Sequence, residues 1–406
     1  MRWKAAFAIF AAALIAPHAA SAGDAGIPLL PDWVRPGLRL TYDLITGGVN
    51  RTADQLKWNP ETHQWDQANI NRGYDTSGNY NGEYSSHGLV QATVAGLDGQ
   101  GVALSQPFFL LNPNQRTPVL MAGANTDMLV ATDTGGDLWM HPQKQAQMLR
   151  QPPAGILVQS TTWRGDGQNW AATTFLSQGA SGKTFAAYDQ ASGKLLYLSR
   201  ITREPPGEGR IRDPRSPTKG NPVSFATILK YVASRQMNIP WMNDPLPEWA
   251  QQFQVLLYQG RQVVQFPGAA DTRGQALAQN LQVQKRGRNW LLLQSNGQAQ
   301  WQQSSGPGPK VVTGPGLLYP LIIPPAGLAR LRPGQEIDRD PLTGFTTHVA
   351  GADAQTVTLQ VDGPDRSMMF VYQRAQGVMM RSSSRERSSA GQNMYVVRDM
   401  QLAGKQ

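Results

Sequence analysis

The chain has 406 residues, a formal net charge of +9, 16% charged side chains and no cysteine. The lack of cysteine excludes disulfides, thiolate catalysis and cysteine-ligated metals, and the length predicts more than one domain with a large apolar core. The mild basic excess favours an acidic partner: an envelope protein, a glycan or an anionic lipid surface. Because no nucleic-acid recognition motif accompanies this charge, we expect no nucleic-acid binding.

Residues 1–22 have the three parts of a cleavable secretory signal peptide. Arg2 and Lys4 form a positive start, Ala5–Ala16 is apolar, and Ala20-Ser21-Ala22 supplies small residues for cleavage. The apolar stretch is shorter than the roughly twenty residues that a membrane-spanning helix needs. We therefore expect an exported protein that is not integral to the membrane, most simply periplasmic, with an extracellular location as the alternative.

Three segments of the chain recur in the same order. Leu30–Tyr42 returns as Leu246–Tyr258, Pro152–Gly155 as Pro324–Gly327, and Tyr188–Leu196 as Tyr372–Met380. This order predicts an internal duplication, with copy one at residues 23–243 and copy two at residues 244–406. We expect the matched Trp33 and Trp249 to be buried at equivalent sites.

Both copies have the pattern of antiparallel β-structure. Short strand-like runs, separated by turns with glycine, are predicted at Thr173–Leu176, Thr184–Tyr188, Leu195–Ile201, Thr356–Val361, Met368–Tyr372 and Val378–Arg381. Helices are predicted at Gln143–Leu149 and Asp271–Gln282. The expected fold is mainly β: two tandem, related antiparallel β-domains of the sandwich or half-barrel type.

Comparison of the copies isolates three insertions. Copy one carries residues 45–86 and 203–222, and copy two carries about a dozen residues at Arg332–Thr343. Insertions into a repeated scaffold lie in loops, where binding residues concentrate.

The first insertion supplies two kinds of candidate site. Its aromatic residues stand among asparagines and suit a sugar-like ligand. They are Trp58, Trp65, Tyr74, Tyr80 and Tyr84. The alternative is that these aromatic side chains only pack on their own scaffold. Its carboxylates and histidines are the components of general acid–base chemistry: Glu61, His63, Asp66, Glu83 and His87. Their spacing matches no metal motif, so we expect no metal.

The second insertion is basic and rich in proline. Arg210, Arg212, Arg215 and Lys219 lie among five prolines, which favour an extended, exposed loop over a helix. Such a loop could dock an acidic partner or could simply join two strands.

Three further motifs predict no separate activity. Gly179–Thr184 resembles a phosphate-binding loop, but Ser177 replaces the first glycine and no helix follows, so we expect a hairpin turn. Asp338 and Asp340 sketch half a calcium loop without its remaining ligands, which is more typical of a turn. The basic group Arg381, Arg385 and Arg387, near Glu386, is interpreted as a solvated strand end.

Three functions follow from these patterns. The leading hypothesis is a non-catalytic, exported binding or envelope-assembly scaffold without a cofactor, because common hydrolase motifs are missing from the sequence. The first alternative is an envelope glycan hydrolase that uses the carboxylate and histidine residues of 45–87. The second arises because tandem β-repeats with these hairpins resemble, in general architecture, periplasmic half-barrel lipid carriers, which implies a lipid or acyl carrier.

Overall fold

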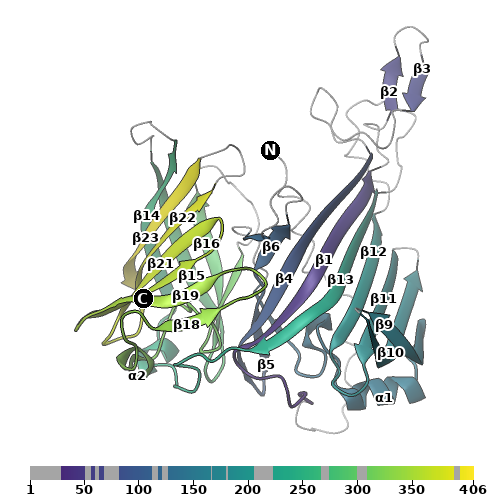
Figure 1. The fold of residues 1–406 in the computed structure, drawn as a ribbon, viewed down its shortest axis with the longest axis horizontal. Coiled ribbons are helices and arrows are strands. Elements are labelled where there is room, and N and C mark those ends of the chain that lie inside the picture. Colours follow the sequence, from purple (N-terminus) through teal and green to yellow (C-terminus); the bar gives the residue numbers. More distant parts are fainter. Residues whose placement is uncertain are drawn as a thin grey trace. The chain divides into compact units, whose positions relative to one another are not determined.

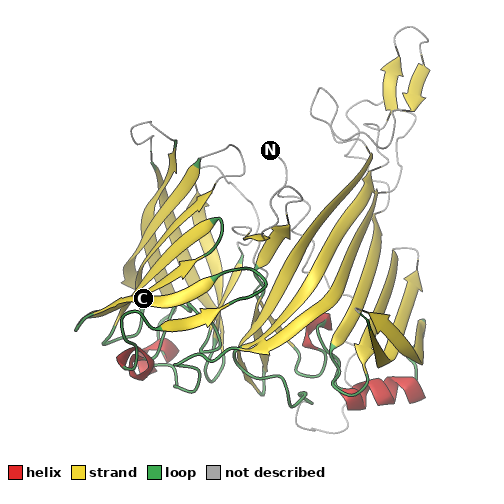
Figure 2. Ribbon diagram, viewed as in Figure 1, coloured by secondary structure: helices red, strands yellow, loops and turns green. Residues whose placement is uncertain are grey.

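The computed structural model describes residues 29–50, 56–59, 64–67, 82–111, 118–120, 127–165, 167–179, 182–204, 223–266, 274–299, 309–387 and 394–406. This part of the chain is mainly antiparallel β-structure, with two large sheets and a few short helices (Figure 2). The predicted fold class is therefore confirmed.

The first sheet contains eleven strands among the described residues (Figure 1). They are β1 (Leu38–Asn50), β4 (Gly82–Asp98), β5 (Gly101–Ser105), β6 (Phe108–Leu111), β7 (Pro118–Leu120), β8 (Met128–Val130), β9 (Ile156–Gly165), β10 (Gln168–Gly179), β11 (Gly182–Asp189), β12 (Leu195–Glu204) and β13 (Val223–Gln236). A separate hairpin pairs β2 (Leu56–Asn59) with β3 (Gln64–Gln67).

The second sheet contains ten described strands and is strongly curled (Figure 1). They are β14 (Val255–Gln265), β15 (Gln275–Arg286), β16 (Leu291–Ala299), β17 (Lys310–Thr313), β18 (Glu336–Arg339), β19 (Thr346–Ala352), β20 (Thr356–Asp362), β21 (Arg366–Gln373), β22 (Met379–Arg387) and β23 (Tyr395–Lys405). Their order in the sheet is β17-β16-β15-β14-β23-β22-β21-β20-β19-β18.

The two sheets share one strand order. In the first sheet β5 pairs with both β4 and β8, which gives the order β8-β5-β4-β1-β13-β12-β11-β10-β9. This order matches, strand for strand, the order β17-β16-β15-β14-β23-β22-β21-β20-β19 of the second sheet. Strand β18 has no counterpart in this match, and it lies within the predicted insertion Arg332–Thr343. A duplication would produce such an order, and the duplication itself stays a prediction.

One pair of predicted repeats has the same local structure in both sheets. Gly193 and Gly377 have φ angles of +80° and +76°, and each carbonyl accepts a backbone hydrogen bond, from Met140 and Ile323 respectively. A Cβ on either glycine would lie 2.3 Å or less from the carbonyl oxygen of that same partner. A register shift precedes Tyr188 in one hairpin and Tyr372 in the other.

The Pro-Pro-Ala-Gly repeat does not have this equivalence. Pro324 and Pro325 cap and begin α2 (Pro325–Ala329), directly after Ile323. Met140, which bonds the equivalent glycine, is instead followed by His141 and α1 (Pro142–Arg150), whereas Pro152–Gly155 comes after that helix. The proline match was therefore a wrong alignment of two differently placed segments.

The helix predictions had mixed outcomes. Gln143–Leu149 lies within α1, as predicted. The helix predicted at Asp271–Gln282 was wrong, because Gln275–Arg286 forms the strand β15 and pairs with β14 and β16. Two short 3₁₀ turns, Gly135–Asp137 and Glu248–Gln251, also occur among the described residues.

The burial expected of Trp33 and Trp249 was also wrong, since both side chains are half-buried. Trp249 donates its indole N–H to the carbonyl of Gln376 and contacts Phe253. The fully buried tryptophans are Trp139, Trp241 and Trp290 within the described residues, and these lie outside the Leu30–Tyr42 repeat.

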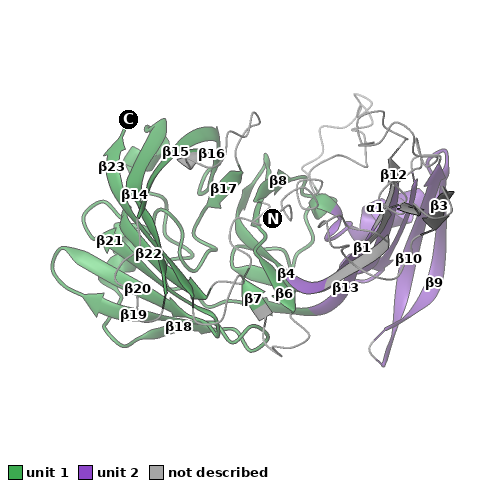
Figure 3. Ribbon diagram, turned by 90° about the horizontal axis from the view of Figure 1, so that it is seen from above, with its two compact units in different colours: residues 1–41, 90–136, 233–406 green, residues 42–89, 137–232 purple. Residues whose placement is uncertain are grey.

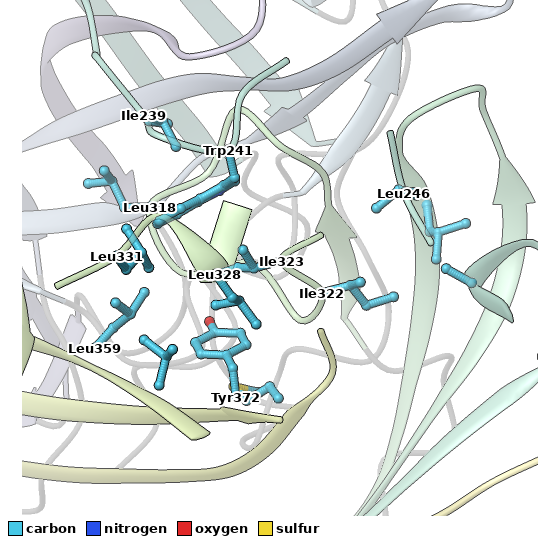
Figure 4. Close-up of a cluster of buried hydrophobic side chains, with 14 of the residues drawn as sticks. Ile239, Trp241, Leu246, Leu318, Ile322, Ile323, Leu328, Leu331, Leu359 and Tyr372 are labelled. Carbon is cyan, nitrogen blue, oxygen red and sulfur yellow. The ribbon is translucent and has the colours of Figure 1, made fainter. Parts of the chain in front are cut away.

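The core of the second sheet gathers at the end where α2 lies (Figure 4). Trp241, Ile322, Leu328, Leu359 and Tyr372 are all fully buried there. The Tyr372 hydroxyl donates to the carbonyl of Pro320 at 2.7 Å, so its burial leaves no unpaired hydroxyl. This core fixes which face of each strand points inward.

By compactness the chain forms two units (Figure 3). Unit 1 comprises residues 1–41, 90–136 and 233–406, and unit 2 comprises residues 42–89 and 137–232. The predicted boundary between residues 243 and 244 stays a prediction. No helix among the described residues is both long and apolar enough to cross a membrane.

Candidate functional site

The strongest candidate site lies on one face of the second sheet, here called the core-side face. Residues directly opposite one another in antiparallel strands share a face, and residues two apart along a strand do so as well. On β15 the alternation is clear, because Gln275, Leu277, Gln279 and Leu281 are half-buried or buried while the residues between them are exposed. Leu281 belongs to the core, so all four lie on the core-side face.

The core-side face changes character along the strands. At the α2 end its side chains are apolar and buried. Further along, Phe370, Met400 and Leu402 of the sheet, together with Tyr319 from the segment after β17, pack against this core but stay partly exposed. The rings of Tyr319 and Phe370 stack with centroids 4.9 Å apart and an interplanar angle of 3°. The apolar core therefore ends in a partly exposed apolar surface.

Beyond this surface the core-side face carries charge. Arg366 lies opposite Glu386, and Arg398 lies opposite both Ser384 and Gln262, so the charged side chains share the face of Phe370. Arg366 and Arg398 both pair with the carboxylate of Glu386, the second at 2.5 Å. The Arg366 and Glu386 side chains are only 8% and 9% exposed, which makes this a buried ion-pair cluster.

Further hydrogen bonds hold the two arginines in place. Arg398 Nε donates to Gln262 Oε1 at 2.7 Å, and Arg366 Nη2 donates to the Leu120 carbonyl at 2.9 Å. The Nε of Arg366 is buried and has no hydrogen-bond partner in the part of the chain that the structure describes. Asp365, at the adjoining β20–β21 turn, has its pKa raised by burial, an effect that Arg366 opposes.

The two carboxylates that sketch half a calcium loop, Asp338 and Asp340, pair with arginines. Asp338 accepts two hydrogen bonds from Arg235, at 2.6 and 2.7 Å. Asp340 accepts from Arg39 at 3.0 Å and from Gln91 at 2.6 Å, and its other oxygen accepts the Leu342 N–H of the turn. Burial raises the pKa of Asp340, but Arg39 and these hydrogen bonds outweigh burial and lower it. Both carboxylates serve as ion-pair partners within unit 1.

The predicted aromatic and basic sites fall largely outside the described residues. Of the aromatic set, Trp58 and Trp65 lie opposite each other in the β2–β3 hairpin, Tyr84 lies on β4, and Tyr74 and Tyr80 lie outside the described residues. The basic set, Arg210, Arg212, Arg215 and Lys219, also lies outside the described residues. Their proposed ligand and partner roles stay predictions.

The acid–base cluster is described only in part. Glu61 and His63 lie outside the described residues, and for Asp66 and Glu83 the backbone alone is described. His87 pairs with Asp43, a residue of β1 that the sequence argument did not include. The other two described histidines are elsewhere: His141 caps α1 through Nδ1, and His348 lies 3.8 Å from Asp362.

Two smaller sequence predictions have a clear outcome. Gly179 and Gly182 face each other at the end of the β10–β11 hairpin, so the segment that resembles a phosphate-binding motif belongs to a hairpin, as predicted, and residues 180–181 lie outside the described residues. The basic group Arg381, Arg385 and Arg387 makes specific contacts that were not predicted: Arg381 pairs with Asp399, and the guanidinium carbon of Arg385 lies 4.0 Å from the centroid of the Tyr395 ring.

Sequence reasoning missed Arg366, Arg398 and Gln262. The visible signal was polar residues at every second position of 382–386, where a core-facing strand is expected to be apolar.

Comparisons with known proteins add no functional information. No family model matches the chain, and no curated protein matches it. Among solved structures, a protein of unknown function from the DUF3598 family of Nostoc punctiforme aligns over 90% of this chain and 96% of its own, with 8% identity and a TM-score of 0.14. At that score the likeness carries no argument.

Proposed function

We propose that the chain is a non-catalytic, exported binding protein that holds an amphipathic ligand on the core-side face of its second sheet. One observation carries this proposal: along the strands, that face changes from a buried apolar core to partly exposed apolar residues and then to arginines. Sites for small molecules are usually apolar surfaces with a few well-placed polar groups, and this face has that composition. Among the three hypotheses from sequence, the carrier alternative accounts best for this gradient.

Export to the periplasm belongs to the same proposal. The signal-peptide pattern predicted at residues 1–22 supports it, and an envelope location would give access to lipids and other amphipathic molecules. Cell fractionation with sequencing of the mature N-terminus tests this part. We expect a periplasmic protein that begins at Gly23, and an uncleaved chain in the cytoplasm would contradict the proposal.

Ligand binding is tested with a neutral apolar fluorophore and two adjacent substitutions. Leu277 lies on the core-side face and Ala278 on the exposed face of the same strand. We expect Leu277→Glu to weaken binding of the fluorophore at least tenfold and Ala278→Glu to leave it unchanged, because only the first places a carboxylate on the binding surface. Equal binding by both variants, with unchanged melting temperatures, would place the ligand elsewhere.

The glycan hydrolase remains an alternative because His87 and Asp43 form a pair beside the first insertion. A histidine held by a carboxylate is a common general base. Incubation of the purified chain with envelope glycan tests it. Release of fragments that His87→Gln abolishes would favour the hydrolase over the binding protein.

A further inference from the structure

We propose that Arg366 and Arg398 bind the anionic head group, a carboxylate or a phosphate, of the amphipathic ligand. This inference rests on the proposed function and names the ligand class for the same site. It starts from an unpaired donor. The Arg366 side chain is 8% exposed, and its Nε lies buried without a hydrogen-bond partner among the described residues. A buried donor without an acceptor destabilises the folded chain, and an anionic oxygen would supply that acceptor.

The charge balance at this end of the sheet also favours an anion. On the core-side face two arginines, Arg366 and Arg398, stand against one carboxylate, Glu386, whereas Arg385 and Arg387 alternate with Glu386 along β22 and so lie on the opposite face. Glu386 is shared by both arginines, and Asp365 lies at the adjoining turn, where burial raises its pKa and Arg366 opposes that rise. The cluster therefore keeps a positive excess, and guanidinium groups bind carboxylate and phosphate through paired hydrogen bonds.

The geometry of β21 connects this charge to the apolar surface. Arg366, Met368 and Phe370 alternate along one strand, so they share the core-side face. At about 3.3 Å per residue, Arg366 and Phe370 lie about 13 Å apart along the strand. A head group at the arginines would thus place an alkyl chain along Met368 and onto the stacked rings of Phe370 and Tyr319.

The test compares three ligands that differ in the head group alone: a long-chain fatty acid, the alcohol of equal length and the corresponding alkyl phosphate. For the wild-type chain at low salt we expect at least one anionic ligand to bind about tenfold tighter than the alcohol, the size expected for a hydrogen bond to a charged group. Whichever anion binds more tightly identifies the head group. Equal binding of all three would overturn this inference and keep the proposed function, whereas no binding of any would contradict the proposed function itself.

Two arginines on neighbouring strands provide a matched pair of variants. Arg398 is on the core-side face, whereas Arg381 is 54% exposed and pairs with Asp399. We expect Arg398→Gln to reduce binding of the anion to the level of the alcohol and Arg381→Gln to leave the preference intact. If both variants lower anion binding equally, the effect is one of overall charge, and the site is not at the arginines.

Arg366 needs a double substitution, because its removal alone would leave Glu386 with a single partner and could unfold the sheet. Arg366→Gln combined with Glu386→Gln keeps the net charge while it removes the buried pair. We expect this double variant to fold, to bind the alcohol normally and to lose the preference for the anion. A folded double variant with the full preference would exclude Arg366 from the site.

Discussion

Asp127 should make unit 1 less stable as pH rises. Its Oδ1 accepts hydrogen bonds from Ser105 Oγ at 2.8 Å and the Gln106 N–H at 3.3 Å, and its Oδ2 accepts the Val312 N–H of β17 at 2.8 Å. Burial of the side chain opposes ionisation more than these hydrogen bonds favour it, so the pKa of Asp127 is raised from 3.8 to about 6.

The sign and size of the effect follow from this pKa. Between pH 3.8 and about 6 the folded chain holds a proton on Asp127 that the unfolded chain has lost, so the free energy of unfolding falls as pH rises. The shift of about two pKa units corresponds to a loss of about 3 kcal/mol, nearly all of it complete at about pH 7. Because the carboxyl is almost fully buried, solvent screening reduces this value little.

The substitution Asp127→Asn removes the titration and leaves all other groups in place. Urea unfolding of both chains between about pH 4 and pH 7 should show the wild type losing about 2–3 kcal/mol more than the variant over that range. The variant itself loses an acceptor at all pH values, so the comparison uses the change with pH and not the absolute stability. Parallel curves for the two chains would refute a raised pKa at Asp127.

Three further predictions concern stability. Gly193→Ala and Gly377→Ala should each destabilise their sheet by about 1–3 kcal/mol, because both positions have positive φ and a crowded Cβ site. Unequal losses of melting temperature in the two variants would weaken the predicted duplication. Trp241→Ala should cost about 3–5 kcal/mol and the half-buried Trp33→Ala clearly less, and a reversed order in urea unfolding would contradict the core assignment. Asp353→Asn should lower the free energy of unfolding at pH values above the unfolded pKa of Asp353, because backbone hydrogen bonds to the ionised carboxylate lower its pKa in the folded chain. The wild type should lose this stabilisation as pH falls. A variant that follows the wild-type acid unfolding curve would contradict this.

The local parts of the fold could be predicted from sequence because their causes are local. The Tyr188 and Tyr372 hairpins depend on a glycine in a left-handed conformation and on alternating strand residues, and both features are visible in the chain. The helix α1 begins with a proline after a capping histidine, which is also a local signal. These elements formed where the sequence predicted them.

Other sequence signals were overruled by pairing between distant segments. Gln275–Arg286 is rich in alanine, glutamine and leucine, which favour a helix, yet β14 and β16 on either side hold it as a strand. The two Pro-Pro-Ala-Gly runs share letters and differ in structure, because one begins a helix and the other follows one.

The sequence by itself determined the β-class, the hairpins and the basic character of residues 381–387. Only the tertiary structure decided that Arg366, Glu386 and Arg398 meet, because they come from three strands whose register depends on pairing. It also decided that Asp338 and Asp340 bond to Arg235 and Arg39, which lie more than a hundred residues away along the chain. Side chains so far apart in the sequence leave no local pattern, since what joins them is strand pairing and packing within unit 1.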